Sequence, residues 1–177
     1  MLKYLTVAFA AIFAFPSQSI AAVEIGKLAP NFTGKDIHGK SVSLDDYRGK
    51  TVVLEWNNPE CPFVVKHYSS NNMQKLQKDA VDDGAIWLSI NSSGKGKQGY
   101  LTPEQAQASY KEKGLASTSY LLDPAGAIGK LYDAKTTPHV FIVDKEGLLA
   151  YQGAIDSKPS FDPKDIEGAE NLSLIHI

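Results

Sequence analysis

Short apolar runs recur along the chain and predict a series of buried strands. They consist mainly of β-branched and other large apolar residues, which favour extended structure in a covered sheet. The runs span residues 51–56, 85–90, 119–122, 139–144 and 148–153. Residues 32–44 add two shorter extended runs around the turn-rich sequence Asp36-Ile37-His38-Gly39, which together predict an N-terminal β-hairpin.

Helical periodicity fills several of the intervals between these runs. Residues 62 to about 81 carry an apolar stripe at helical spacing, with a polar interruption at 69–72. Thr102, Pro103 and Gln105 form a helix start with Thr as N-cap, and we expect that helix to end at Gly114. A further short helix is expected at 125–132. Strands that alternate with helices and then close in a hairpin predict an α/β fold with a mixed central sheet flanked by helices.

The first 21 residues have the layout of a secretory signal peptide. Lys3 gives a positive start, residues 5–15 are apolar and uncharged, and Ser19 and Ala21 supply the small residues of a cleavage site. A membrane anchor is the alternative, but this apolar run is shorter than the roughly 20 residues that a span needs. We therefore expect an exported protein, in the bacterial periplasm, with no stable membrane insertion after cleavage.

Composition narrows the class of protein further. The chain has 177 residues, 43% of them apolar, and a formal net charge of −2. Such a chain has room for one ordinary domain, which we place at residues 22–170, and it lacks the basic surface that nucleic-acid binding needs. One cysteine excludes an internal disulfide framework and a cysteine-rich zinc cluster.

That single cysteine, Cys61, stands where a reactive thiol is expected. It follows the strand at 51–56 through a short loop and precedes Pro62, which favours the first turn of a helix. A helix N-terminus combines unpaired N–H groups with the positive end of the helix dipole, and both favour a thiolate. The alternative is an inert cysteine that packs as a small apolar residue.

Several further segments stand in a distinctive order and spacing around Cys61. They are residues 25–32, Val42-Ser43-Leu44 before Gly49-Lys50, Glu55-Trp56, Cys61-Pro62, Thr136-Thr137-Pro138 and residues 141–147. Together they resemble the thioredoxin-fold superfamily, in its exported redoxin or AhpC/TSA-like (peroxiredoxin-like) branch. The resemblance spans residues 23–168 and implies a thioredoxin-like fold with Cys61 as the attacking nucleophile.

The resemblance also implies roles for residues around Cys61. Pro138 matches the cis-proline that faces the active cysteine, and the backbone beside it, at Thr137, would receive an extended substrate strand; a trans proline that opens a strand is the alternative. Glu55 matches the buried carboxylate that helps proton transfer in thioredoxins, and it would share a strand face with Val53. An exposed glutamate at the strand end is the other possibility.

The sequence also departs from both patterns that it resembles. Thioredoxins need Cys-x-x-Cys, whereas Val64 stands at the second position here, so no neighbouring thiol releases a mixed disulfide. Peroxiredoxins carry Thr or Ser three residues before the cysteine and Pro seven before it, where this chain has Asn58 and Leu54. They also place an arginine against the cysteine, and the single arginine here is Arg48, in the loop before the strand at 51–56.

Other candidate groups carry weaker expectations. Lys66 and His67 lie one turn or more beyond Cys61, and we expect them to be solvated surface residues, with a supply of positive charge to the sulfur as the alternative. The four histidines are scattered and predict no closed metal site, so we expect neither a metal nor another cofactor. His139, next to Pro138, retains a weak metal or acid–base option.

The C-terminal residues carry an expectation of their own. Members of the branch often continue past the closing hairpin with another helix and a tail that bears a further cysteine. Residues 171–177 turn abruptly apolar without a capping signal, and we interpret them as a truncated or non-native tail. A resolving cysteine would then be missing from this sequence.

The combined prediction is an exported thiol-dependent oxidoreductase that acts through Cys61. Peroxiredoxin-like antioxidant activity ranks first, because one cysteine suffices to attack a peroxide. Thiol–disulfide exchange with a partner protein is the alternative, and a non-catalytic thioredoxin-fold module that binds peptides is the rival from another class. The expected partners are a peroxide or a protein disulfide as substrate and an external thiol as reductant.

Overall fold

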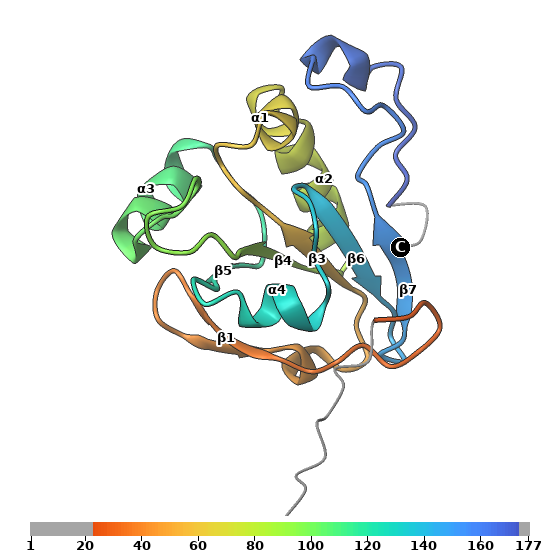
Figure 1. Ribbon diagram of the computed structural model, residues 1–177. Helices are drawn as coiled ribbons and strands as arrows, with labels where there is room; N and C mark the ends of the chain where they lie inside the picture. Colours follow the sequence, from red (N-terminus) through yellow and green to blue (C-terminus); the bar gives the residue numbers. More distant parts are fainter. Residues whose placement is uncertain (1–22, 174–177) are drawn as a thin grey trace, which may run out of the picture.

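Seven strands form one mixed sheet in the computed structural model, which describes residues 23–173. Their order across the sheet is β2-β1-β5-β4-β3-β6-β7, with β3, β4 and β5 parallel and the other neighbouring pairs antiparallel (Figure 1). The strands are β1 Thr33–Asp36, β2 Ser41–Ser43, β3 Val52–Trp56, β4 Ile86–Asn91, β5 Ser119–Leu122, β6 His139–Val143 and β7 Leu149–Gly153. The predicted hairpin, the central strands and the mixed α/β class are confirmed.

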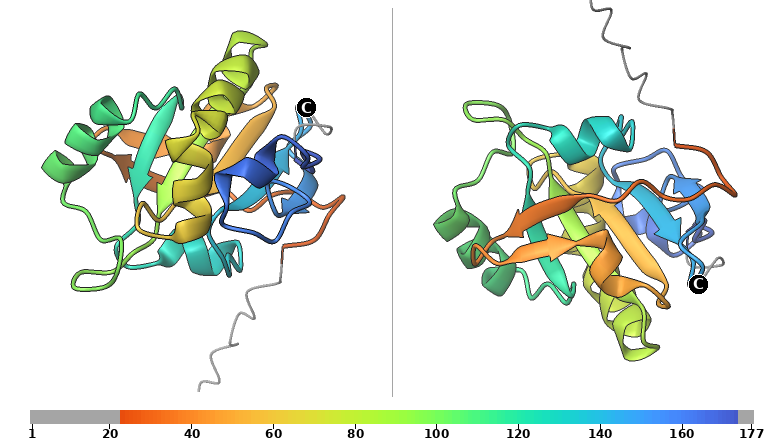
Figure 2. Two further views of the ribbon diagram at one scale, coloured as in Figure 1. Left: turned by 90° about the horizontal axis from the view of Figure 1, so that it is seen from above. Right: turned by 90° about the horizontal axis from the view of Figure 1, so that it is seen from below.

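Helices cover both faces of this sheet. They are α1 Pro62–Ser69, α2 Asn72–Asp82, α3 Pro103–Glu112 and α4 Ala127–Leu131, with short 3₁₀ turns η1 Leu44–Tyr47 and η2 Pro163–Ile166. Seen from opposite sides, α1 and α2 lie over one face of the sheet, whereas α4 lies over the other (Figure 2). The capping box that the sequence predicts for α3 is present, since Thr102 Oγ1 accepts from the N–H of Gln105 and the Gln105 side chain accepts from the N–H of Thr102.

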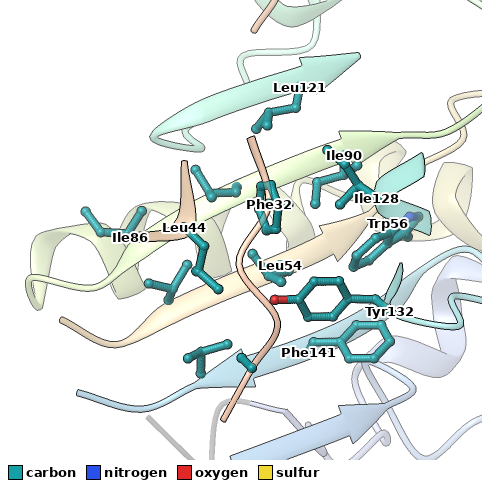
Figure 3. Packing of buried hydrophobic residues seen from close by; sticks show 14 of the residues in the cluster. Phe32, Leu44, Leu54, Trp56, Ile86, Ile90, Leu121, Ile128, Tyr132 and Phe141 are labelled. Carbon is teal, nitrogen blue, oxygen red and sulfur yellow. The ribbon is translucent and has the colours of Figure 1, made fainter. Parts of the chain in front are cut away.

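Alternation along β3 divides the core into two layers. Leu54 and Trp56 face the α4 side, where they pack with Phe141 and Tyr132 (Figure 3). The Trp56 and Phe141 ring centroids lie 5.1 Å apart, and those of Tyr132 and Phe141 lie 5.4 Å apart. Val53 points to the opposite layer, under α1 and α2. Full burial of each large apolar side chain contributes roughly 1.5–3 kcal/mol, so these layers fix β3 firmly beneath the helices.

The helix predicted from residue 62 to about 81 is in fact two helices. Ser70 Oγ donates to the carbonyl oxygens of Lys66 at 2.8 Å and His67 at 3.2 Å, and Asn71 takes a left-handed conformation with φ 57°. A hydroxyl that bonds the last carbonyls competes with helix continuation, and a left-handed residue ends it. The polar interruption at 69–72 is therefore a break between α1 and α2.

After β7 the chain turns back across α1, and we call residues 154–173 the C-terminal segment. Ile155 is buried in the same core layer as α1 and α2, and its carbonyl accepts from the N–H of Leu172 at 3.1 Å. Asp156 pairs with Asn171 in an isolated bridge, so part of the predicted tail at 171–177 packs against the fold. Figures 1 and 2 show this segment, in dark blue, beside α1. The predicted signal peptide and residues 174–177 lie outside the described residues.

Within residues 23–173, no helix combines the length and the apolar character needed to cross a membrane.

Candidate active site at Cys61

Cys61 lies at the carboxyl end of β3, where ligands commonly bind in open α/β sheets. It is the N-cap of α1 with Pro62 as the first helical residue, as the sequence predicts. Its N–H donates to Asn58 O at 3.0 Å and its carbonyl accepts from Val65 N at 2.9 Å, so the backbone on both sides is held. The side chain is partly exposed, and its sulfur is a free thiol.

The sulfur faces the loop before β6 rather than the helix. Cys61 Sγ donates to Thr137 O at 3.1 Å, and the Thr137–Pro138 peptide bond is cis. The expected meeting of Cys61 with the Thr137–Pro138 backbone, 76 residues away, is therefore observed. No helix N–H caps the sulfur, in contrast to the arrangement expected at the helix N-terminus. A carbonyl only accepts hydrogen bonds, so this contact belongs to the protonated thiol.

Asn58 shapes the loop that carries Cys61 and makes no bond to the sulfur. Its Oδ1 accepts from Glu60 N at 2.9 Å, while its Nδ2 points to Gln98 O at 3.5 Å. Gly99 donates its N–H to Glu60 Oε2 at 3.1 Å, with φ +75°. A Cβ at Gly99 would lie 2.0 Å from Asn58 Oδ1, so a side chain here would displace Asn58. The sequence analysis did not predict this support from Gly99 for the loop that carries Cys61.

Glu55 lies under α1 as a fully buried carboxylate, on the same face of β3 as Val53. This confirms the buried alternative over the exposed one. Five side chains donate to its two oxygens at 2.7–3.1 Å: Asn57 Nδ2, Tyr68 OH, Gln77 Nε2, Trp87 Nε1 and Ser89 Oγ. Hydrogen bonds from neutral groups thus compensate for the loss of water around the carboxylate.

The Tyr68 hydroxyl is part of this cluster. Burial raises the pKa of Tyr68 well above its usual value, and the adjacent Glu55 carboxylate raises it further. Tyr68 therefore stays protonated and donates to Glu55 Oε1 at 2.7 Å. Since Tyr68 belongs to α1, the contact ties the helix that begins at Cys61 to the sheet.

Lys66 and His67 are buried, and the expectation that they are solvated surface residues is wrong. They are 1% and 2% exposed, because the C-terminal segment lies over this side of α1. Lys66 Nζ donates to Asp156 Oδ2 at 2.8 Å, and His67 Nε2 lies 3.4 Å from the same oxygen. His67 Nδ1 contacts Asn72 Nδ2 at 2.8 Å. These contacts hold the C-terminal segment against α1.

Burial also sets the charge of His67. Desolvation lowers its pKa to about 4, although the Asp156 carboxylate opposes this and the Lys66 ammonium reinforces it. His67 is therefore neutral near pH 7, and Lys66 supplies the positive charge that balances Asp156. Neither side chain hydrogen-bonds to Cys61, and both contact Asp156 of the C-terminal segment.

A cavity of about 470 Å³ lies between α1 and the C-terminal segment and extends to Thr137, whose carbonyl contacts Cys61 Sγ. Phe63, Lys66 and His67 form one wall, residues 154–160 and Leu172 form another, and residues 136–138 complete the lining. Phe63 stands edge-on to Phe161, with ring centroids 6.3 Å apart. The Thr137 residue that contacts the sulfur is thus also part of this cavity.

Arg48 and His139 lie away from the sulfur. Arg48 precedes β3, at the end opposite Cys61, and its Nη2 pairs with Asp45 Oδ1 at 2.6 Å. The His139 ring packs 4.4 Å from Phe141, on the α4 side of the sheet, and burial lowers its pKa. Within residues 23–173, no three His, Cys, Asp or Glu side chains are arranged to hold a metal ion.

Two groups of functional interest, the donors around Glu55 and the Asp156 carboxylate, were not predicted from the sequence. The donors around Glu55 come from four separate parts of the chain. The sequence does not indicate toward which partner each of these side chains points. Asp156 stands in a polar stretch after the last strand with no motif around it. Its pairing with Lys66 spans 90 residues and depends on where the C-terminal segment folds.

Comparison with known proteins places these features among thiol-active proteins. Residues 25–152 match the model of the AhpC/TSA family. Over 134 residues the chain is 28% identical to the thiol-disulfide oxidoreductase ResA of Bacillus thuringiensis subsp. konkukian, covering 72% of this chain and 68% of that protein. Over 131 residues it is 30% identical to the peroxiredoxin Bcp of Bacillus subtilis, covering 72% and 82%.

A solved structure supports the same fold. The crystal structure of a putative thiol:disulfide interchange protein DsbE from Chlorobium tepidum superimposes with a TM-score of 0.62. It is 22% identical, and the match covers 75% of this chain and 86% of that one, so it is evidence for the fold alone. With the mixed sheet and the flanking helices, it confirms the thioredoxin-like fold.

Proposed function

Because the chain belongs to the AhpC/TSA family, we propose that it is a thiol oxidoreductase in which Cys61 exchanges disulfides with a partner protein. The contact between Cys61 Sγ and the Thr137 carbonyl, beside Pro138, carries this proposal. It sets the sulfur next to backbone that can pair with an extended peptide. The relationship to ResA, itself called a thiol-disulfide oxidoreductase, supports the same reaction.

The reaction begins when the Cys61 thiol loses its proton to solvent, which releases the Thr137 carbonyl. The thiolate then remains at the N-terminus of α1, where the helix dipole favours negative charge. It attacks one sulfur of a substrate disulfide, so that a new S–S bond joins Cys61 to the substrate and the second substrate sulfur leaves as a thiolate with the bonding electron pair. An external thiolate attacks this mixed disulfide and returns Cys61 as a thiolate.

Peroxide reduction is the second candidate, favoured by the similarity to the peroxiredoxin Bcp. Here the Cys61 thiolate would attack one peroxide oxygen, giving a sulfenic acid and releasing the other oxygen as an alcohol or water after protonation. Donors that stabilise the breaking O–O bond would speed this step. Within residues 23–173, no cationic or hydroxyl side chain donates to Cys61 Sγ, and Asn58 and Arg48 point elsewhere. This ranks exchange above the reaction that the sequence alone favoured.

Two reactions on one reduced sample separate these candidates. One portion receives glutathione disulfide, and a second receives hydrogen peroxide with a sulfenic-acid trap. Intact mass follows both adducts over time, and a synthetic peptide of residues 56–65 provides the rate of the same cysteine outside the fold. Cys61→Ser should abolish both adducts.

We expect the disulfide adduct at Cys61 to form about tenfold faster than in the reference peptide, because the fold holds the sulfur beside the Thr137–Pro138 backbone, with which the peptide of glutathione can pair. Trapping after peroxide should match the reference. If sulfenic-acid trapping at Cys61 were faster than in the reference peptide while the disulfide adduct formed at the reference rate, peroxide reduction would replace disulfide exchange as the proposed function. Reference rates in both reactions would contradict an enzymatic role and support a module that binds peptides.

We also propose export to the bacterial periplasm, supported by the tripartite pattern of residues 1–21. The chain should be recovered from the periplasmic fraction of a bacterial host with Ala22 as its first residue. Ala21→Arg should block cleavage and leave the N-terminal segment attached, whereas Ser17→Arg, farther from the cleavage site, should retard it less. A full-length mass in the cytoplasm would contradict export.

A further inference from the structure

The cavity beside Cys61 has no role in the sulfur chemistry described above. Its volume of about 470 Å³ lies within the range of sites that hold ligands, roughly 300–1,000 Å³. One wall includes Thr137, the residue whose carbonyl contacts the sulfur. A group bound there would lie next to a disulfide under attack by Cys61.

Lys66 and His67, the polar side chains of α1 that line this cavity, are already paired within the protein, so the cavity is suited to an apolar occupant. Lys66 Nζ already donates to Asp156 Oδ2 at 2.8 Å and to Lys158 O at 3.4 Å. Both ring nitrogens of His67 already have neighbours, Asn72 and Asp156. The surface that remains is formed largely by Phe63, Pro138, Ile155, Pro159 and Leu172. An occupant with a buried polar group would lose its hydrogen bonds to water without replacing them.

The backbone along the cavity indicates that the occupant belongs to a peptide. Within residues 23–173, Thr137 makes one hydrogen bond, which its carbonyl accepts from Cys61, and Thr136 makes none. Backbone groups beside a site are normally paired, and an extended peptide can pair with such a strip. A peptide lying there would project side chains to either side.

The two sides of this strip differ in chemistry. A smaller cavity of about 220 Å³ lies on the other side of Thr136 and Thr137, and it is lined by the polar side chains of Asn58, Ser92 and Lys135 among others. A large apolar side chain is therefore best accommodated on the side of Phe63 and the C-terminal segment.

We propose that the cavity between α1 and the C-terminal segment binds a large apolar side chain of an extended polypeptide substrate, adjacent to the disulfide that Cys61 attacks. The inference rests on the proposed exchange reaction and assigns its substrate class. Because residues 154–160 and Leu172 form one wall, the C-terminal segment determines specificity without touching the sulfur.

A set of short peptides tests this assignment. Each has one cysteine in a serine background and carries thionitrobenzoate on that cysteine through a disulfide. One peptide is all serine otherwise, and four others place phenylalanine at the first or second position on either side. Attack by Cys61 on the peptide sulfur forms the mixed disulfide and releases thionitrobenzoate, whose absorbance gives the rate. The small disulfide dithiobis(nitrobenzoate) measures Cys61 reactivity without any peptide.

We expect at least one phenylalanine position to react about tenfold faster than the serine peptide, which corresponds to burial of most of an aromatic side chain. Phe63→Ala should reduce that ratio to about twofold or less, and Phe63→Leu should restore much of it. Leu28→Ala removes another exposed apolar side chain, near the β6–β7 turn at the opposite end of β6, and should leave the ratio unchanged.

The outcomes distinguish the two levels of the proposal. Equal rates for all the peptides, with dithiobis(nitrobenzoate) still reacting at Cys61, would overturn the apolar subsite and leave the exchange reaction standing. A ratio that persists in Phe63→Ala would likewise overturn the assignment to this cavity. No reaction with any disulfide would overturn the proposed function and the subsite with it.

Discussion

Two carboxylates, Glu55 and Asp156, lie on different sides of α1 and hold it by different chemistry. Glu55 is fully buried and accepts hydrogen bonds from neutral donors, one of which is Tyr68 of α1. Asp156 lies in the C-terminal segment and faces Lys66 and His67, also of α1. The first carboxylate is compensated by dipoles from the core, and the second by a cation from the helix it anchors.

Glu55 and its donors are part of the folded core, and we call this cluster the frame. Asp156 and its contacts attach the C-terminal segment to α1, and we call this segment the wall of the cavity. The donors to Glu55 come from α1, α2, β4 and the loop after β3, so the cluster joins the sheet to both helices under Cys61. The Asp156 contacts join one segment to one helix, and they close the cavity beside the sulfur. We expect loss of the first to unfold the domain and loss of the second to open the wall.

The strongest test of the frame is Glu55→Leu. It leaves buried donors of Tyr68, Trp87 and Ser89 without their acceptor, and an unpaired buried group costs about 1–3 kcal/mol. We expect the free energy of unfolding to fall by about 4 kcal/mol or more in denaturant titrations. Glu112→Leu, at an exposed position of α3, should change it by about 0.5 kcal/mol at most. A stable Glu55→Leu protein would show that the donors do not depend on the carboxylate.

The matching test of the wall is Asp156→Asn. It leaves the Lys66 ammonium buried without its counter-charge, and breaking such a pair costs about 3 kcal/mol. Hydrogen exchange should rise in residues 154–173 and stay slow in β3 and β4.

The double variant Lys66→Met with Asp156→Leu is its control. It removes both charges, so it should recover part of the lost stability. Uniformly faster exchange throughout the sheet in Asp156→Asn would contradict a local role for this pair.

A pH titration should also distinguish the two sides. The pKa of His67 is lowered from 6.5 to about 4, so between these values the unfolded chain binds a proton that the folded chain does not. Stability from His67 is complete above pH 6.5 and is lost as the pH falls towards 4, by about 3 kcal/mol. His67→Gln should flatten the unfolding curve in this window, whereas the exposed His38→Gln should not. Equal slopes in the two variants would contradict a neutral buried His67.

The smallest expected effect concerns the loop that carries Cys61. Gly99 supports this loop by its bond to Glu60, and it belongs neither to the Glu55 cluster nor to the Asp156 contacts. Gly96 and Gly99 both have positive φ, but only at Gly99 would a Cβ meet Asn58. Gly99→Ala should therefore cost about 1 kcal/mol more than Gly96→Ala, and it should slow exchange at Cys61. Adding Asn58→Ala to Gly99→Ala should remove the stability difference. Equal costs for both glycine variants would mean that the loop adjusts freely.

The sequence by itself determined most of the secondary structure and the place of the thiol. Apolar runs located the strands, the Thr102 capping box located α3, and Cys61-Pro62 after a buried strand located the sulfur at a helix start. These features follow from local patterns, because strand burial and helix capping depend on residues that are close in the chain. The family resemblance added the meeting of Cys61 with Thr137 and Pro138.

Only the tertiary structure decided what surrounds that sulfur. From the sequence, Lys66 and His67 were predicted to be surface residues. The C-terminal segment that buries them lies about 90 residues later and carries no motif. The sulfur turns to a carbonyl rather than to the helix because a distant loop packs against it. The direction of a polar side chain is set by whichever donors and acceptors the fold brings near, and local sequence contains no record of those partners.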